Sequence, residues 1–126
     1  MNRRTERIGK LLQHEIGRVL LEKLADPRID TARTSITHVE IQEDLLVAKV
    51  YVSVIGTEAE QQRCIKALSR ASGRIRAIVR DNIILRHTPV LEFLIDHQFK
   101  KTLETLDVIR QAMNEIHEKE STKDTN

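Results

Sequence analysis

The chain has 126 residues, which is enough for one compact domain with a hydrophobic core, since domains usually hold roughly 100–200 residues. Its 21 lysines and arginines nearly cancel its 19 aspartates and glutamates, so the net charge of +2 does not by itself indicate any partner. The single cysteine excludes an internal disulfide framework and a cysteine-rich zinc site.

The first predicted element is a long amphipathic helix near the N-terminus. Between Ile8 and Leu24 the apolar residues recur at intervals of three and four, which places them on one face of a helix. Pro27 disfavours helical geometry at Asp26 and has no backbone N–H to donate, so we expect the helix to end near Ala25. A connecting loop follows.

Two strands are predicted after this loop. The segment 34–42 is rich in β-branched residues, and apolar residues alternate with other residues from Leu46 to Val54. A short turn around Glu43 and Asp44 joins the two segments. Gly56 ends the second strand.

Two helices, a strand and a final helix are predicted in the rest of the chain. Helical spacing continues from Ala59 to Ile83, with a break expected at Gly73 because glycine commonly ends a helix. Beyond Pro89, alternating apolar and acidic residues predict a third strand at 91–96. A last amphipathic helix is predicted over 99–116.

This order of elements predicts the α+β class. Three strands can bury one face under helices, which gives a two-layer sandwich. We expect residues 1–117 to form a single domain that includes the last helix, and we expect the polar segment 118–126 to be a disordered tail.

Positive charge collects in one window of the sequence. Seven basic residues and a single acid, Asp81, lie between Arg63 and Arg86. Such runs are usually solvated helix faces, but the other helices mix both signs, and the near absence of acids here favours binding to a polyanion. A second basic cluster lies at the start of the first helix.

The turn Ala71-Ser72-Gly73 lies where the two middle helices are expected to meet. A helix N-terminus offers backbone N–H groups and partial positive charge to a phosphate, and glycine allows close approach. On local grounds an ordinary role, with Gly73 ending one helix and Ser72 capping the next, is supported about equally well.

Several separated segments resemble the bacterial ribosome-binding factor A family, and they occur in the same order. The matching segments are Asp26-Pro27-Arg28, residues 36–41 with Asp44-Leu45, residues 48–54, residues 67–68 running into 71–76, and Leu85-Arg86 with residues 89–93 and Asp96. The resemblance extends from about Arg3 to Phe99, and the long helix beyond Phe99 matches less distinctively.

The resemblance implies a KH-like domain of the second topological type, α-β-β-α-α-β, with an extra C-terminal helix. In this family a helix-kink-helix, here at Ala71-Ser72-Gly73, replaces the usual Gly-x-x-Gly loop. The resemblance also implies a function: binding of the free small ribosomal subunit and its ribosomal RNA, and assistance in late maturation of that RNA, including at low temperature.

The small number of aromatic residues constrains how RNA could be bound. Tyr51, Phe93 and Phe99 are the only three, too few for the stacking platforms of sequence-reading RNA modules. We therefore expect arginines to bind phosphates and to recognise the shape of the RNA. The candidate RNA-binding residues are Arg3, Arg4, Arg7, Arg63, Lys66, Arg70, Ser72, Gly73, Arg74, Arg76, Arg80 and Arg86.

Other classes of function find less support. The histidines lack metal-ligand spacing and no phosphate loop or nucleophile motif occurs, so we expect no enzymatic activity, no metal and no cofactor. A helix-turn-helix DNA-binding module and a protein-interaction module that uses the last helix remain as alternatives. The sequence shows no signal-peptide core and no membrane span, so we expect a cytoplasmic monomer with no membrane partner.

Overall fold

The computed structural model describes residues 3–22 and 26–124. Its elements are α1 (Arg3–Glu22), β1 (Thr34–Ile41), β2 (Val47–Val54), α2 (Glu58–Asn82), β3 (Val90–Ile95) and α3 (His97–Asp124). The elements from α1 to β3 belong to one compact unit that ends at Asp96, and α3 belongs to a second unit. None of the described helices combines the length and the apolar character needed to cross a membrane.

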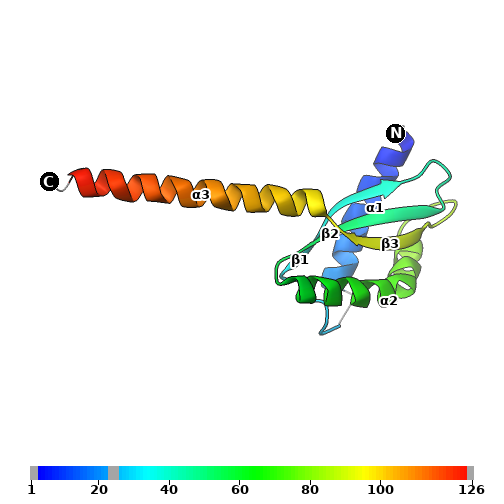
Figure 1. Cartoon of the computed structure of the whole chain (residues 1–126). Helices are drawn as coiled ribbons and strands as arrows, with labels where there is room; N and C mark the ends of the chain where they lie inside the picture. Colours follow the sequence, from blue (N-terminus) through cyan, green and yellow to red (C-terminus); the bar gives the residue numbers. More distant parts are fainter. Residues whose placement is uncertain (1–2, 23–25, 125–126) are drawn as a thin grey trace. The chain divides into compact units, whose positions relative to one another are not determined.

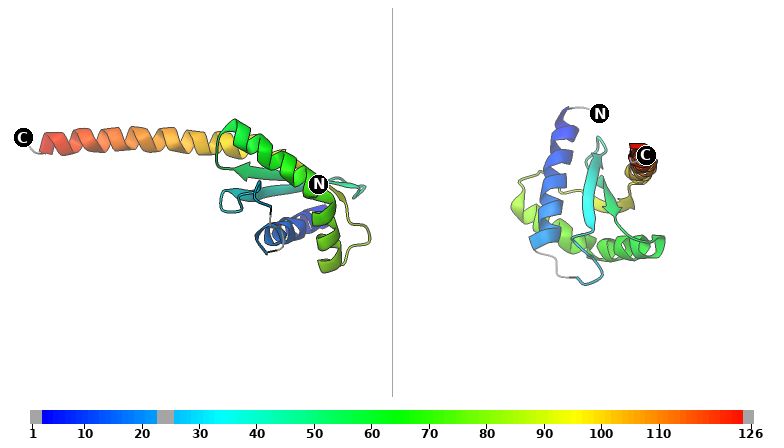
Figure 2. Two further views of the ribbon diagram at one scale, coloured as in Figure 1. Left: turned by 90° about the horizontal axis from the view of Figure 1, so that it is seen from below. Right: turned by 90° about the vertical axis from the view of Figure 1, so that its left-hand side faces the viewer.

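The three strands form one sheet in the order β1-β2-β3. β1 and β2 are antiparallel, whereas β2 and β3 are parallel, so the chain must cross from one end of the sheet to the other through α2. α1 packs on β1 and α2 packs on β3, and both helices cover the same face of the sheet (Figures 1 and 2). The predicted two-layer α+β sandwich is therefore observed.

The core lies between the sheet and the two helices. Strand residues that alternate along each strand are buried, including Val50 and Val52 on β2 and Phe93 on β3. Leu12 and Ile16 of α1 meet the same cluster and are fully buried. These are the positions that the period-two and helical patterns in the sequence place on the inner faces.

α1 approaches β1 closely because residue 9 is glycine. A Cβ atom at Gly9 would lie only 2.8 Å from the carbonyl oxygen of Val39. One turn further along α1, the Gln13 side chain donates to the carbonyls of Ile36 and Thr37, both at 3.3 Å. These carbonyls lie where the register of β1 against β2 shifts, so α1 satisfies backbone groups at an irregular point of an edge strand.

α2 is one continuous helix, and the prediction of a break at Gly73 is wrong in this respect. The helix runs from Glu58 to Asn82 and includes Ser72 and Gly73. Figures 1 and 2 show that α2 bends near its middle. Serine-glycine pairs are common sites of helix kinks, so the Ser72-Gly73 pair accounts for a bend that leaves the helix unbroken. The helix-turn-helix alternative needs two separate helices, which this segment does not provide.

The other element boundaries differ little from the predictions. Both strands of the hairpin and the third strand agree to within one residue at each end. α1 ends at Glu22, and the predicted end near Ala25 lies outside the described residues. α3 continues to Asp124 and so includes most of the segment for which the sequence predicts a disordered tail. The division into a domain over 1–117 and a tail over 118–126 stays a prediction.

Candidate nucleic-acid interface

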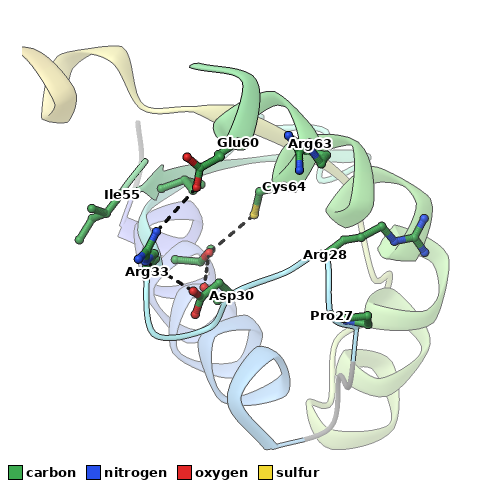
Figure 3. Close-up of a pocket in the computed structure, with 10 residues that line it drawn as sticks. Pro27, Arg28, Asp30, Arg33, Ile55, Glu60, Arg63 and Cys64 are labelled. Atoms are coloured by element: carbon green, nitrogen blue, oxygen red, sulfur yellow. Dashed lines mark hydrogen bonds and ion pairs between the residues drawn. The ribbon is translucent and has the colours of Figure 1, made fainter. Parts of the chain in front are cut away.

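The first half of α2 faces the loop that follows α1, and a pocket of about 240 Å³ lies between them (Figure 3). Three arginines line this pocket, namely Arg28 and Arg33 from the loop and Arg63 from α2. Arg33 is compensated, because it lies 3.6 Å from Asp30 and 3.7 Å from Glu60. Arg63 forms no ion pair within the described part of the chain. Its guanidinium therefore remains available to an anion.

The Asp26-Pro27-Arg28 segment holds one of these cations in place. The Asp26 carboxylate accepts from the backbone N–H of Arg28 at 2.9 Å and from its Nε at 3.2 Å. The Arg28 backbone N–H and then its guanidinium lower the pKa of Asp26, and the charges of Arg28 and Arg70 lower it further. Arg70 of α2 therefore lies near this loop, on the same side of the helix as Arg63.

Cys64 lies beside the same pocket and has a packing role. Its side chain is buried, and its sulfur lies 3.6 Å from the Thr34 hydroxyl. Burial raises the pKa of the Cys64 thiol, which opposes formation of a nucleophilic thiolate. Among the described residues, no group of three His, Cys, Asp or Glu side chains is placed to hold a metal ion.

The second half of α2 is tied to the loop before β3 by Arg76. The guanidinium donates to the carbonyl oxygen of Thr88 through Nε at 3.1 Å and through Nη2 at 2.7 Å. Thr88 is buried, so the loss of both bonds would leave its carbonyl short of donors. Arg76 is therefore partly committed to the fold, a role that the basic pattern in the sequence does not reveal.

The other basic side chains of α2 are exposed and uncompensated. Lys66, Arg74 and Arg80 are exposed, and none of them forms a salt bridge with another described residue. Between them, Ser72 is half-buried, whereas Gly73 is exposed and has open space where a Cβ would lie. The bend thus presents an uncovered backbone flanked by cations. It does not present a helix N-terminus, because residues 71–73 lie inside α2.

The basic cluster at the start of α1 lies close to Arg86, another of the candidate RNA-binding residues. Arg3, Arg4 and Arg7 of α1 line a hollow of about 560 Å³ together with Arg86, which follows α2. The sequence placed these residues in two separate clusters, and only the fold brings them together. The candidate residues thus form two groups within the first unit, one along α2 and one at this hollow.

The outer face of the sheet carries both signs of charge, because Lys49 lies between its strand partners Glu40 and Glu92. The Tyr51 hydroxyl donates to Glu40 at 3.3 Å, and its ring stacks on His38 with centroids 6.0 Å apart. Burial raises the pKa of Tyr51, and the carboxylates of Glu40, Asp96 and Glu92 raise it further. An acidic neighbourhood of this kind disfavours phosphate, so Tyr51 is not placed to stack an RNA base.

Comparison with known proteins supplies the family. The family model described as ribosome-binding factor A matches residues 4–109. Among curated relatives, ribosome-binding factor A of Caldanaerobacter subterraneus subsp. tengcongensis is 36% identical over 111 residues, covering 88% of this chain and 90% of the relative. That of Thermomicrobium roseum is 34% identical over 118 residues, covering 94% of this chain and 90% of the relative.

Solved structures agree with this result. The crystal structure of ribosome-binding factor A from Thermus thermophilus is 27% identical and superposes with a TM-score of 0.63, covering 72% of this chain and 94% of the other. A Thermus thermophilus ribosome-binding factor A homology model, fitted into a cryo-EM map of its complex with the 30S subunit, is 29% identical with a TM-score of 0.56, covering 68% and 88%. The expected KH-like α+β fold is confirmed, and the chain belongs to the ribosome-binding factor A family.

Proposed function

We propose that this protein binds the free small ribosomal subunit through the phosphates of its ribosomal RNA and assists late maturation of that RNA, including at low temperature. It acts as a non-enzymatic monomer in the cytoplasm. A related factor has been placed on the 30S subunit, which supports this choice of partner. The observation that carries the proposal is the set of exposed, uncompensated cations along α2 on both sides of the Ser72-Gly73 bend.

The geometry supports backbone binding more than base reading. Guanidinium groups form forked bonds with phosphate oxygens, and a bent helix without a side chain at residue 73 allows a sugar-phosphate backbone to approach. Phe93, by contrast, is buried in the core, and Tyr51 lies among carboxylates. Recognition is therefore expected to depend on the three-dimensional form of the RNA site.

Charge reversal on α2 tests the proposal. The double variant Arg74→Glu with Arg80→Glu changes two exposed side chains and leaves Arg76 on the Thr88 carbonyl. We expect its affinity for free small subunits to fall by at least about a hundredfold, since two phosphate contacts become repulsive, while the melting temperature stays near that of wild type.

A matched control makes the same change in net charge elsewhere. Lys101→Glu with Arg110→Glu alters two cations of α3 and none of α2. Binding that is as weak in the control as in the α2 variant would mean that total charge governs the affinity. Undiminished binding by the folded α2 variant would overturn the assignment of α2 as the RNA-binding surface.

A further inference from the structure

The hollow at the start of α1 has mixed chemistry. Four of its lining residues are arginines, and the other three are the aliphatic residues Ile8, Ile84 and Leu85. No described residue that lines the hollow is acidic, and within the described part of the chain the four guanidinium groups form no ion pair. Its volume of about 560 Å³ lies within the range of roughly 300–1,000 Å³ typical of small-ligand sites.

Ile84 is fully exposed at this hollow, with a relative accessibility of 103%. Its neighbour Ile83 is buried and Leu85 is half-buried, so the chain after α2 turns one aliphatic residue inward and presents the next to solvent. Arg86 is exposed as well. Single exposed aliphatic residues are common. What distinguishes Ile84 is that it lies among four arginines brought from two distant parts of the sequence.

We propose that this hollow binds one unpaired nucleotide of a structured RNA, with the arginines on the flanking phosphates and Ile84 against the face of the base. Apolar side chains bind nucleic acids in this way when they insert beside an unstacked base, while nearby arginines neutralise the backbone. The site needs no aromatic residue, which matches a chain that has only three. This site is distinct from the exposed cations along α2. The inference rests on the proposed function only in requiring that the partner is RNA.

An acidic peptide is the competing ligand for a cationic hollow, and the two differ in what Ile84 contributes. A peptide carboxylate needs the arginines alone, whereas an extruded base also needs an apolar surface to replace part of its lost stacking. The predicted signature is therefore a contribution of Ile84 that depends on an unpaired base and is independent of salt. The arginines, in contrast, contribute a salt-dependent part.

The test uses the full chain and two short RNA hairpins, one fully paired and one with a single bulged adenosine. In fluorescence anisotropy, Ile84→Ser should weaken binding to the bulged hairpin by roughly tenfold and leave binding to the paired hairpin unchanged. Leu21→Ser is the matched control, since Leu21 is a 71% exposed aliphatic residue at the other end of α1. It should bind both hairpins like wild type.

A second variant examines the arginines. Arg7→Gln with Arg86→Gln should weaken both hairpins and reduce the slope of log K against log salt by about 1 to 2. The inference is overturned if Ile84→Ser affects both hairpins equally or neither, or if the arginine variant leaves the salt slope unchanged.

The same variants can be sedimented with small subunits. Loss of subunit binding on α2 charge reversal, together with no base-dependent effect of Ile84→Ser, would refute the hollow alone and leave the proposed function standing.

Discussion

At the scale of single residues, Gly73 offers the sharpest separation of stability from binding. The residue is helical, and a Cβ added there would meet nothing within 4 Å. Glycine inside a helix costs about 0.5–1 kcal/mol relative to alanine, so Gly73→Ala should increase the free energy of unfolding by that amount. If RNA backbone approaches the bend, the same variant should bind small subunits several-fold more weakly. Denaturant titration and co-sedimentation measure the two effects.

Gly17 provides the control for this substitution. It also lies inside a helix with open space where a Cβ would be added, but on α1 and away from the bend. Gly17→Ala should stabilise the fold by a similar amount and leave binding unchanged. Wild-type affinity in a stabilised Gly73→Ala protein would contradict close approach of RNA at residue 73.

The sequence shows which residues are cationic, but it does not show which of their side chains are free of hydrogen bonds within the fold. Arg76 and Arg80 have the same side chain and helical spacing, yet Arg76 donates to the Thr88 carbonyl, twelve residues away, whereas Arg80 does not. That difference depends on how the loop before β3 folds back on α2, which no local pattern encodes. The approach of Arg86 to the N-terminal arginines likewise depends on the packing of α1 against α2.

At the scale of elements, the start of α2 is fixed by a capping box. The Thr57 hydroxyl accepts from the Glu60 backbone N–H at 3.2 Å, and the Glu60 carboxylate accepts from the Thr57 backbone N–H. Loss of an N-cap hydroxyl typically costs about 1 kcal/mol, so Thr57→Ala should lower the free energy of unfolding by about that amount. Thr57→Ser keeps the hydroxyl and should remain near wild type. Equal stability of all three proteins would mean that the cap does not matter.

The cap should also depend on pH in a defined direction. The backbone N–H and the hydroxyl of Thr57 lower the pKa of Glu60 below its ordinary value of 4.5, and the charge of Arg33 lowers it further. A carboxylate with a lowered pKa in the folded state stabilises the fold above the ordinary pKa, and this contribution is lost as the pH falls through the folded pKa. The melting-temperature difference between wild type and Glu60→Ala should therefore shrink from about pH 7 towards about pH 3.

Most helices and strands could be predicted from the sequence, and the exception is the break predicted in α2. The strands are bounded by turn residues, and either β-branched residues (β1) or alternating apolar residues (β2 and β3) mark them, so their limits could be predicted closely. The predicted break in α2 gave too much weight to a single glycine, whose cost in a helix is only about 1 kcal/mol. The buried positions Cys64, Ala67 and Leu68 continue through half-buried Ala71 to Ile75 at intervals of three and four. That uninterrupted spacing was the available signal that the helix continues.

At the scale of the whole sandwich, charge is unevenly distributed. Cations lie along α2 and at the hollow beside α1, while Glu40, Glu92 and Asp96 surround Tyr51 on the sheet. A protein with this distribution is oriented as it approaches a polyanion, because the uncompensated cations attract it more strongly than the sheet face, where Lys49 lies between Glu40 and Glu92. The small net charge of the chain conceals this asymmetry. The family resemblance indicated the class of partner. Which side of the protein faces that partner could be inferred only from the fold.

The most direct test of the proposed function is co-sedimentation of the full chain with free small subunits and with complete ribosomes over a range of salt concentrations. We expect preference for the free small subunit and a log K that falls with log salt at a slope on the order of −3 to −4, as predicted when about five phosphates are neutralised. Equal binding to both particles, or an affinity that does not change with salt, would contradict it.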